Sequence, residues 1–467
     1  MRNFLSELKN KILVFDGSKG YLLQKFGMKG GECPELWNIE HKDVVRKIYS
    51  LYKEAGSDVI QTNTFTGNRA HLDRHQLGDR TYELNFEGTK LAREVMGNDG
   101  FVAASIGPTG MLMEPMGELT FDKAYELYKE QIQAVVDGGA DIINFETFTD
   151  VAEMRAALLA AREIANLPVI CSISFESNGR TLMGTDPETA VVILKSLGAD
   201  LIGTNCSFGP ELMVDIVRKM HSAGSGFLSV KPNAGLPEIV DGISVYKETA
   251  DNFANLVSKF VNDGGRLIGG CCGTTPEFIK AIRMEIDRIN AGFSCSNANN
   301  INANNIYDIC EIKNNAALNN IITSSVRNIH IDDYESVSIG YLSTKNDCQL
   351  LNKLVEGDLS IVMDKVMDLS EEDYDCIQIN VDSAIKAVRN SRETGSGSCD
   401  LLAHVVNEAQ GFLKEPFILE TMYPDELEGA LRIYKGRAGV VTNDQSQNSE
   451  DACTIQCVAK KYGAVII

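Results

Sequence analysis

A near-repeat of six residues occurs four times in the chain and constrains the fold more than any other feature. Its copies are Ala55-Gly-Ser-Asp-Val-Ile, Gly138-Gly-Ala-Asp-Ile-Ile, Leu197-Gly-Ala-Asp-Leu-Ile and Asp263-Gly-Gly-Arg-Leu-Ile. Glycine can end a helix at such a point, and the apolar residues after it can begin a buried strand. A helix that passes directly into a strand, again and again along the chain, predicts a series of βα units.

Eight short apolar runs fit the strands of this series. They are Ile12–Asp16, Val59–Asn63, Val102–Gly107, Ile142–Glu146, Val169–Phe175, Leu201–Cys206, Phe227–Asn233 and Leu267–Cys271. Helical patterns lie between them, most clearly at Lys42–Glu54, Phe121–Val136, Val151–Ile164 and Thr249–Val261. The α/β pattern of residues 1–290 therefore predicts a (β/α)8 TIM barrel, in which reactive groups lie at the carboxyl ends of the strands.

The composition changes after this region. Ten asparagines fall between Asn297 and Asn320, so residues 291–330 are interpreted as an Asn-rich linker. The βα alternation then returns, with strands expected at Val337–Tyr341, Cys376–Val381, Phe417–Thr421, Gly439–Thr442 and Ala464–Ile467. Because five strands cannot close an eight-stranded barrel, residues 331–467 are expected to form a partial, open βα half-barrel domain, a fragment of a longer protein, or a domain completed by another chain.

The bulk composition excludes several classes of protein. Apolar residues make up 44% and charged residues 23% of the chain, as in ordinary globular proteins. A formal charge of −21 argues against a surface that binds nucleic acid. We find neither a signal peptide nor a run of about 18 apolar residues that could enter a membrane. A cytoplasmic location is expected, and the twelve cysteines are interpreted as reduced thiols.

Three of these cysteines form the strongest chemical signal. Cys271 and Cys272 lie in a glycine-rich segment, Gly269-Gly-Cys-Cys-Gly-Thr-Thr-Pro276, and Cys206 ends the sixth predicted strand. Three thiolates with a fourth position left open are typical of a catalytic zinc site, because structural zinc sites are normally closed by four protein ligands. The alternatives from the residues alone are buried apolar thiols or a vicinal disulfide.

The first 290 residues resemble the homocysteine-binding barrel of cobalamin-dependent methionine synthase and its relatives in the homocysteine S-methyltransferase family. The motifs that carry the resemblance are Phe15-Asp-Gly17, Gln61-Thr-Asn-Thr-Phe65, Ser105-Ile-Gly-Pro-Thr-Gly110, Phe145-Glu-Thr147, Asn205-Cys-Ser207, Pro232-Asn-Ala-Gly-Leu-Pro237 and the Cys-Cys segment. The resemblance implies that Cys206, Cys271 and Cys272 bind Zn²⁺ and that the sulfur of homocysteine takes the fourth position.

The resemblance also implies the groups that bind the rest of the substrate. Asn233 is expected at the fourth position of the zinc when homocysteine is absent. Asp16 and Glu146 are expected to receive the α-amino group of homocysteine. The backbone amides near Gly17 and Gly107, together with Asn63, are expected to hold its carboxylate.

The second domain resembles, more faintly, the start of the pterin-binding barrel that follows in the same enzymes. Its echoes are Ile339-Gly340, Leu350 to Asp358, Ile377-Gln-Ile-Asn-Val381, Leu419-Glu-Thr421, Tyr423 to Ala430 and Lys460-Lys-Tyr-Gly463. The chain departs from the family pattern at Tyr341-Leu-Ser-Thr344 and at Gln378 and Glu420, which replace two aspartates. Folate activity is therefore not expected of this domain.

Three functions fit these expectations. The first is methyl transfer to the zinc-bound thiolate of homocysteine, giving methionine, with a methylcorrinoid such as methylcobalamin supplied by a partner protein. The second uses the same acceptor with S-methylmethionine or another sulfonium donor. The third is a non-catalytic protein that binds zinc and thiols.

The segment Asp73-Arg-His-Gln-Leu-Gly78 matches a pattern with which some domains ligate a corrinoid. No corrinoid-type domain surrounds it in this sequence, so His75 is expected to be a surface residue.

Overall fold

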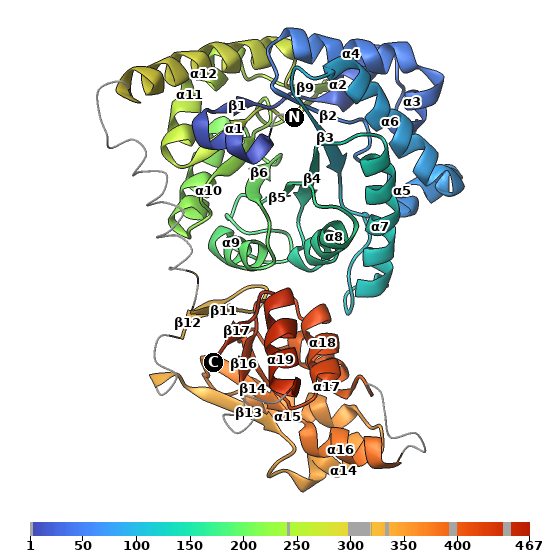
Figure 1. The fold of residues 1–467 in the computed structure, drawn as a ribbon, viewed down its shortest axis with the longest axis vertical. Helices are drawn as coiled ribbons and strands as arrows, with labels where there is room; N and C mark the ends of the chain where they lie inside the picture. The colour runs from blue at the N-terminus through green and yellow to red at the C-terminus, as the bar shows by residue number, and fades with distance from the viewer. Residues whose placement is uncertain are drawn as a thin grey trace. The chain divides into compact units, whose positions relative to one another are not determined.

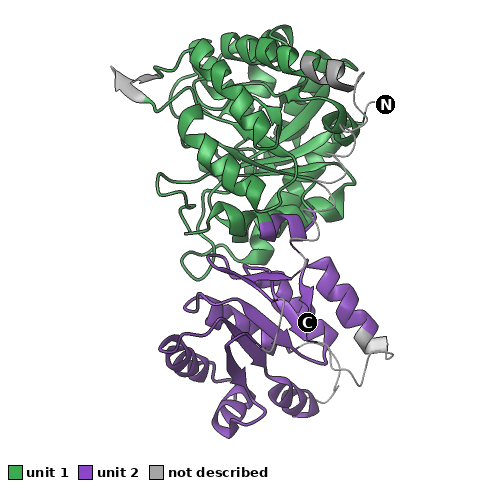
Figure 2. Cartoon of the chain, turned by 90° about the vertical axis from the view of Figure 1, so that its left-hand side faces the viewer, with its two compact units in different colours: residues 1–191, 199–316 green, residues 192–198, 317–467 purple. Residues whose placement is uncertain are grey.

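The computed structural model describes residues 3–240, 243–297, 318, 320–331, 336–391, 399–441 and 450–467. Most of the Asn-rich segment lies outside these residues. The chain divides into two compact units, residues 1–191 with 199–316 and residues 192–198 with 317–467 (Figure 2). Within the described residues, no helix is both long enough and apolar enough to span a bilayer.

The first unit is built on a parallel sheet of eight strands. They are β1 Leu13–Val14, β2 Val59–Gln61, β3 Phe101–Ile106, β4 Ile142–Phe148, β5 Val169–Ile173, β6 Leu201–Asn205, β7 Leu228–Lys231 and β10 Gly265–Ile268. The hydrogen-bonded order is β1-β10-β7-β6-β5-β4-β3-β2. A parallel bridge between Phe15 and Val59 joins the two ends of this order, so the sheet closes as the predicted (β/α)8 barrel.

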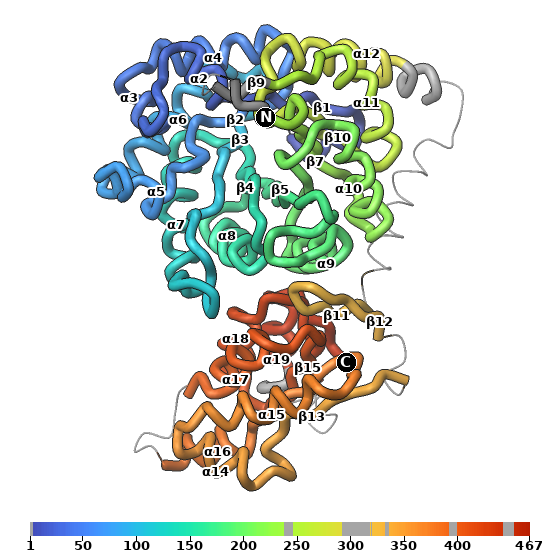
Figure 3. Tube along the Cα trace, turned by 180° about the vertical axis from the view of Figure 1, so that it is seen from behind, coloured from blue at the N-terminus to red at the C-terminus, as the bar shows by residue number. Residues whose placement is uncertain are grey.

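Helices follow the strands and surround them, as the views from both sides show (Figures 1 and 3). The outer helices are α4 Lys42–Glu54, α6 Thr81–Met96, α7 Phe121–Asp137, α8 Val151–Ile164, α9 Pro187–Ser196, α10 Pro210–Ser222, α11 Ala250–Asn262 and α12 Pro276–Asn297. The helices predicted at the positions of α4 and α8 are confirmed with the same bounds. Shorter elements in the connections are α2 Lys19–Lys25, α3 Trp37–Glu40, α5 Arg69–Leu72, three short 3₁₀ turns and the ribbon β8 Glu238–Val240 with β9 Ile243–Val245.

The amino end of the barrel is closed by side chains that the sequence reasoning did not assign. Helix α1 (Phe4–Asn10) places Phe4 and Leu8 in the same buried cluster as residues from the starts of the strands, including Leu13 and Ile142. Apolar packing of this kind stabilises the barrel at the amino ends of its strands.

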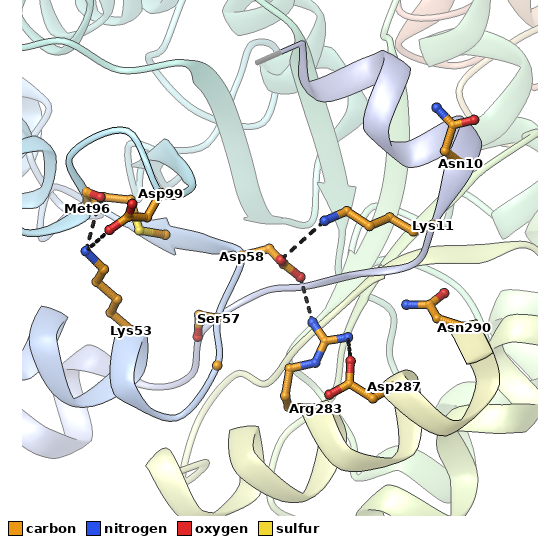
Figure 4. Close-up of a pocket in the computed structure, with 11 residues that line it drawn as sticks. Asn10, Lys11, Lys53, Ser57, Asp58, Met96, Asp99, Arg283, Asp287 and Asn290 are labelled. Atoms are coloured by element: carbon orange, nitrogen blue, oxygen red, sulfur yellow. Dashed lines mark hydrogen bonds and ion pairs between the residues drawn. The ribbon is translucent and has the colours of Figure 1, made fainter. Parts of the chain in front are cut away.

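An ionic network lies beside this cluster, around a cavity of about 610 Å³ (Figure 4). Asp58 pairs with Arg283 at 2.8 Å and with Lys11 at 3.8 Å, and Lys53 pairs with Asp99 at 2.8 Å. The cavity is larger than the one at the other end of the barrel, but it lies at the amino ends of the strands, where TIM barrels place stabilising contacts. We therefore interpret this end as structural.

The second unit has a parallel sheet of five strands in sequential order. They are β13 Ile339–Ser343, β14 Cys376–Asn380, β15 Phe417–Glu420, β16 Gly439–Val441 and β17 Val465–Ile466. The helices are α14 Cys348–Val355, α15 Ser360–Ser370, α16 Asp382–Ser391, α17 Leu401–Gln410, α18 Pro424–Ile433 and α19 Glu450–Lys461. This arrangement confirms the predicted open βα domain, although Thr442 lies outside the described residues.

A two-stranded ribbon, β11 Ile321–Thr323 with β12 Asn328–His330, belongs to the second unit. Its Ile322 packs in one buried cluster with Cys376 and Ile418. The ribbon and the end of α12 both fall inside residues 291–330, where the composition predicts a linker, so this segment contains more secondary structure than expected. The predicted domain boundaries themselves stay a prediction.

Candidate active site

The three predicted zinc cysteines come together at the carboxyl end of the barrel. Cys206 directly follows β6, and Cys271 and Cys272 follow β10 after two glycines. Their sulfur atoms all lie within 4.8 Å of one another, and Cys206 Sγ lies 3.8 Å from Cys272 Sγ. Two sulfurs bound to one tetrahedral zinc at about 2.3 Å each would be about 3.8 Å apart. The donor set therefore fits a zinc ion in number, chemistry and spacing.

The backbone conformation around Cys271 and Cys272 allows both side chains to reach one site. Gly273 has a φ of 77°, and a side chain there would begin 2.4 Å from the ring of Tyr246. Only glycine fits both constraints. Because the chain leaves the strand before Cys271, the two adjacent cysteines no longer have to point to opposite faces, and both reach the same site.

Three residues with a strained backbone conformation also lie at the carboxyl end of the barrel. Thr147, Cys206 and Ser207 have φ values of 65°, 64° and 62°, a conformation that is uncommon outside glycine. The side chain of Asn205 fixes this geometry, since it both accepts from and donates to Thr147 at 2.8 Å and also donates to Cys271 Sγ at 3.6 Å. Such strain persists where neighbouring contacts over-determine the conformation, and it is common at functional sites.

The thiols share their protons unequally. Hydrogen bonds lower the pKa of Cys206 to about 3, and the bond with Cys271 contributes more than the bond with Cys272. The hydrogen bond with Cys206 raises the pKa of Cys271 to about 11 and also raises the pKa of Cys272. Cys206 is thus the most acidic thiol of the cluster. Three thiolates together need a cation, which is the role that a bound metal fills.

Two other expectations for these cysteines can be compared with the structure. The ten cysteines whose side chains the structure describes are all free thiols, so a vicinal disulfide is not formed. Asn233 lies beside the cluster, where its Oδ1 accepts from the Cys272 amide at 3.0 Å and its side chain hydrogen-bonds to Cys206. Asn233 is therefore close to the position that the resemblance gives it.

The sulfur cluster opens into a cavity of about 410 Å³. The predicted site residues on its wall are Gly17, Asn63, Glu146, Cys206, Cys271 and Cys272. Asp16, Gly107 and Asn233 are not on this wall, and Asp16 is fully buried. The structure therefore brings six of the predicted residues to one cavity and places the other three outside it.

Asp16 is only partly satisfied by the protein. Its Oδ2 accepts from Lys19 Nζ at 2.8 Å and from the Gln61 amide at 2.8 Å. Its Oδ1 is buried and has no hydrogen-bond partner among the described residues. Burial raises the pKa of Asp16, against the opposing effect of Lys19. A buried acceptor without a partner is rare in native proteins and indicates a place for a donor.

Both carboxylate oxygens of Glu146 have partners within the protein. Its Oε2 forms an ion pair with Lys231, whose side chain has no exposed surface, and its Oε1 accepts from Gln61 Nε2 at 2.5 Å and from Ser105. Gln61 thus connects Asp16 and Glu146. The sequence motifs include Gln61 but do not indicate this role for it, and they do not point to Lys19 or Lys231. Two positive and two negative side chains at the mouth give a network whose formal charge is zero.

The donors expected for the carboxylate are mostly engaged. The Gly107 amide donates to the Phe65 carbonyl at 2.8 Å. The side-chain nitrogen of Asn63 donates to the Pro34 carbonyl at 2.7 Å and to Asn38 Oδ1 at 2.9 Å. These contacts leave neither group free to donate to a substrate carboxylate in this conformation.

His75 lies in the 3₁₀ turn Asp73–His75 and is exposed. This placement agrees with the surface position expected for it.

Comparison with known proteins agrees with the geometry. Residues 13–286, more than half of the chain, match the profile of the homocysteine S-methyltransferase family. The chain belongs to this family. It is 32% identical over 310 residues to methionine synthase of Mycobacterium leprae (strain TN), and 32% identical over 307 residues to methionine synthase of Mycobacterium tuberculosis (strain ATCC 25618 / H37Rv). Each alignment covers 62% of this chain but 26% of the relative, so the chain spans about a quarter of the length of these relatives.

A solved structure supports the fold. The metallated form of the Escherichia coli homocysteine methyltransferase MmuM superposes with a TM-score of 0.50 at 22% identity, covering 59% of this chain and 96% of that one. Its oxidized form gives the same TM-score and identity, covering 60% of this chain and 97% of that one. At this level of identity the likeness shows a shared barrel.

Proposed function

We propose that the barrel transfers a methyl group to the sulfur of homocysteine and so makes methionine. The observation that carries the proposal is the cluster of three thiols at the strand ends, beside a buried carboxylate with a free acceptor. Family membership and the name of the methionine synthase relatives support the same acceptor and product. We assign residues 1–290 to this reaction.

The proposed metal is zinc, with Cys206, Cys271 and Cys272 as its protein ligands. When bound, zinc supplies a positive charge that keeps an incoming thiol deprotonated near neutral pH and leaves it nucleophilic. The three cysteines hold the charge in place, and Asn205 fixes Cys271 relative to Thr147. Asn233 is the proposed fourth ligand in the absence of substrate. The reduced thiols that this site needs agree with a cytoplasmic location.

The α-ammonium group of the substrate is proposed to bind at Asp16 and Glu146. Asp16 is the better acceptor of the two, because both oxygens of Glu146 already have partners within the protein. An ammonium group placed between two carboxylates would be held by charge-assisted hydrogen bonds, which are stronger than neutral ones. The amino end of the substrate is thereby fixed while its sulfur faces the cysteines.

The proposed methyl donor is a methylcorrinoid carried by a partner protein. The thiolate of homocysteine attacks the methyl carbon, a sulfur–carbon bond forms, and the cobalt–carbon bond breaks with its electron pair left on cobalt. The thiol proton is released before the attack. Residues 331–467 are proposed to lack folate activity, so the methyl group would not be loaded by this domain.

A comparison of two methyl donors tests the proposal. The purified full chain is incubated with homocysteine and either methylcobalamin or S-methylmethionine, and methionine is measured by mass spectrometry. We expect methionine from methylcobalamin. Methionine from S-methylmethionine alone would establish the sulfonium alternative. Homocysteine binding without methionine from either donor would favour a non-catalytic zinc-thiol protein.

A further inference from the structure

Lys19 occupies an unusual position for a lysine, because it lines the cavity and also pairs with the buried Asp16. Its side chain is 11% exposed and lines the cavity. Its Nζ makes one short contact, 2.8 Å to Asp16 Oδ2, and two long ones, 3.4 Å to the Gly17 carbonyl and 3.5 Å to Gln61 Oε1. A lysine ammonium has three donors. Two of them therefore make only long hydrogen bonds.

The pairing of Lys19 with Asp16 matches the charges of a free amino acid. The α-ammonium and α-carboxylate groups are attached to one carbon, so a protein that binds both needs an anion and a cation side by side. Asp16 Oδ1 is the acceptor without a partner, and the Lys19 ammonium lies 2.8 Å from the other oxygen of the same carboxylate. This pair can receive the two charged groups of one α-carbon together.

Two of the three groups expected to bind the carboxylate are used elsewhere. The Gly107 amide and the Asn63 side chain donate to protein acceptors. The second buried cation, Lys231, is paired with Glu146 and also lies 4.6 Å from the ring centroid of Phe15. Among the described residues that line the cavity, Lys19 is the one with a cationic side chain, and two of its three hydrogen bonds are long.

We propose that Lys19 is a specificity-determining residue that binds the α-carboxylate of the substrate while Asp16 binds the α-ammonium. This inference rests on the proposed function and deepens it, because it states which thiols the site accepts. Asp16, Glu146, Lys19 and Lys231 sum to no formal charge, so a neutral zwitterion enters without leaving an unpaired charge. A thiol that carries the ammonium group alone leaves Lys19 without its anion and binds more weakly.

Two ligands and three substitutions test this inference. Binding to the zinc-loaded full chain is measured by calorimetry for homocysteine and for 3-mercaptopropylamine, which keeps the thiol and the ammonium group and lacks the carboxylate. The variants are Lys19→Met, the conservative Lys19→Arg and, as a control on an exposed lysine of the same region, Lys29→Met. Zinc content and the circular dichroism spectrum are recorded for each protein.

The expected result concerns the ratio of the two affinities. The wild type and Lys29→Met prefer homocysteine by about ten-fold to a hundred-fold, as loss of one charged hydrogen bond implies. Lys19→Met loses this preference by weakening homocysteine alone, whereas Lys19→Arg keeps it. An unchanged ratio in Lys19→Met, or equal weakening of both ligands, would overturn the role of Lys19. If the wild type binds neither ligand, the proposed function itself fails, and this outcome is separate from the other two.

Discussion

Both units alternate strands and helices, but they have different side chains at the carboxyl ends of their strands. In the barrel, three thiols and a charged network around Gln61 meet at the carboxyl ends. In the second unit, the corresponding cavity of about 490 Å³ is lined by Gln378 and Glu420, which hydrogen-bond to each other at 2.7 Å. Among the described residues, the one cluster of metal-ligating side chains lies in the barrel. Strand order alone therefore does not give a site its chemistry, and the residues at the strand ends do.

Closure distinguishes the units as well. The bridge between Phe15 and Val59 completes the eight-stranded sheet, so groups from β1 and β2 face those from β4 and β7 across one mouth. The five strands of the second unit run in sequential order from β13 to β17, with no pairing between these two in the described structure. Its cavity consequently lacks the facing strands that surround the barrel site.

The largest effect is expected from the cysteines themselves. Serine at position 206, 271 or 272 replaces a thiolate with a poor zinc ligand, so each variant should lose both zinc and methyl transfer. Zinc is measured by mass spectrometry and activity by methionine formation. Cys348→Ser, on an exposed cysteine of the second unit, is the control and should change neither. Full zinc content in all three variants would contradict the proposed ligands.

Glu146→Gln should lower the free energy of unfolding, because Glu146 is the ion-pair partner of Lys231. The substitution leaves Lys231 as a buried cation without its anion, which costs about 3 to 5 kcal/mol. Urea unfolding of the barrel measures this loss. The double variant Glu146→Gln with Lys231→Met removes both charges and should recover most of the stability. If the double variant is as unstable as the single one, the ion pair is not the cause.

Asp16→Asn should act on the substrate while leaving the metal in place. The change removes the negative charge that the α-ammonium needs, and one charge-assisted contact is worth about 1.5 to 3 kcal/mol, or roughly ten-fold to more than a hundred-fold in affinity. Calorimetry with homocysteine measures the loss, and zinc analysis provides the control. Homocysteine affinity equal to that of the wild type would place the ammonium group elsewhere.

The smallest effect is expected in the second unit. Gln378 and Glu420 satisfy each other, and two aspartates of the pterin-binding pattern are absent at these positions. A site that has lost buried polar partners for a ligand binds it far more weakly. Methyltetrahydrofolate at millimolar concentration should give no heat of binding to the full chain. A saturable isotherm in the micromolar range would reverse the distinction drawn between the two units.

Much of this fold could be predicted from the sequence, because periodicity and glycine breaks are local signals. All eight barrel strands and all five strands of the second unit overlap their predicted positions, and the largest difference at a described strand end is three residues, at the end of β10. The ribbons β8–β9 and β11–β12 were not predicted, since strands of three residues in polar segments leave little periodicity to detect. The cysteines could be grouped in advance because strand ends of a closed barrel share one mouth.

The charged network could not be predicted in the same way. The contact of Lys231 with Glu146 joins β7 to β4 across the barrel, and its existence depends on side-chain reach, which the pattern of apolar residues does not contain. Lys19 follows the Asp-Gly motif and resembles an ordinary helix-start residue in the sequence. The engagement of Gly107 and Asn63 by other protein groups likewise becomes visible only with their partners in place.

X-ray absorption at the zinc edge tests whether the three cysteines bind the metal and leave one position for the substrate. We expect one zinc per chain, bound by three sulfur atoms at about 2.3 Å and one lighter atom. Addition of homocysteine should replace the lighter atom, so that four sulfur atoms surround the metal. A chain that retains no zinc after purification with zinc present, or a spectrum unchanged by saturating homocysteine, would rule out the proposed zinc site.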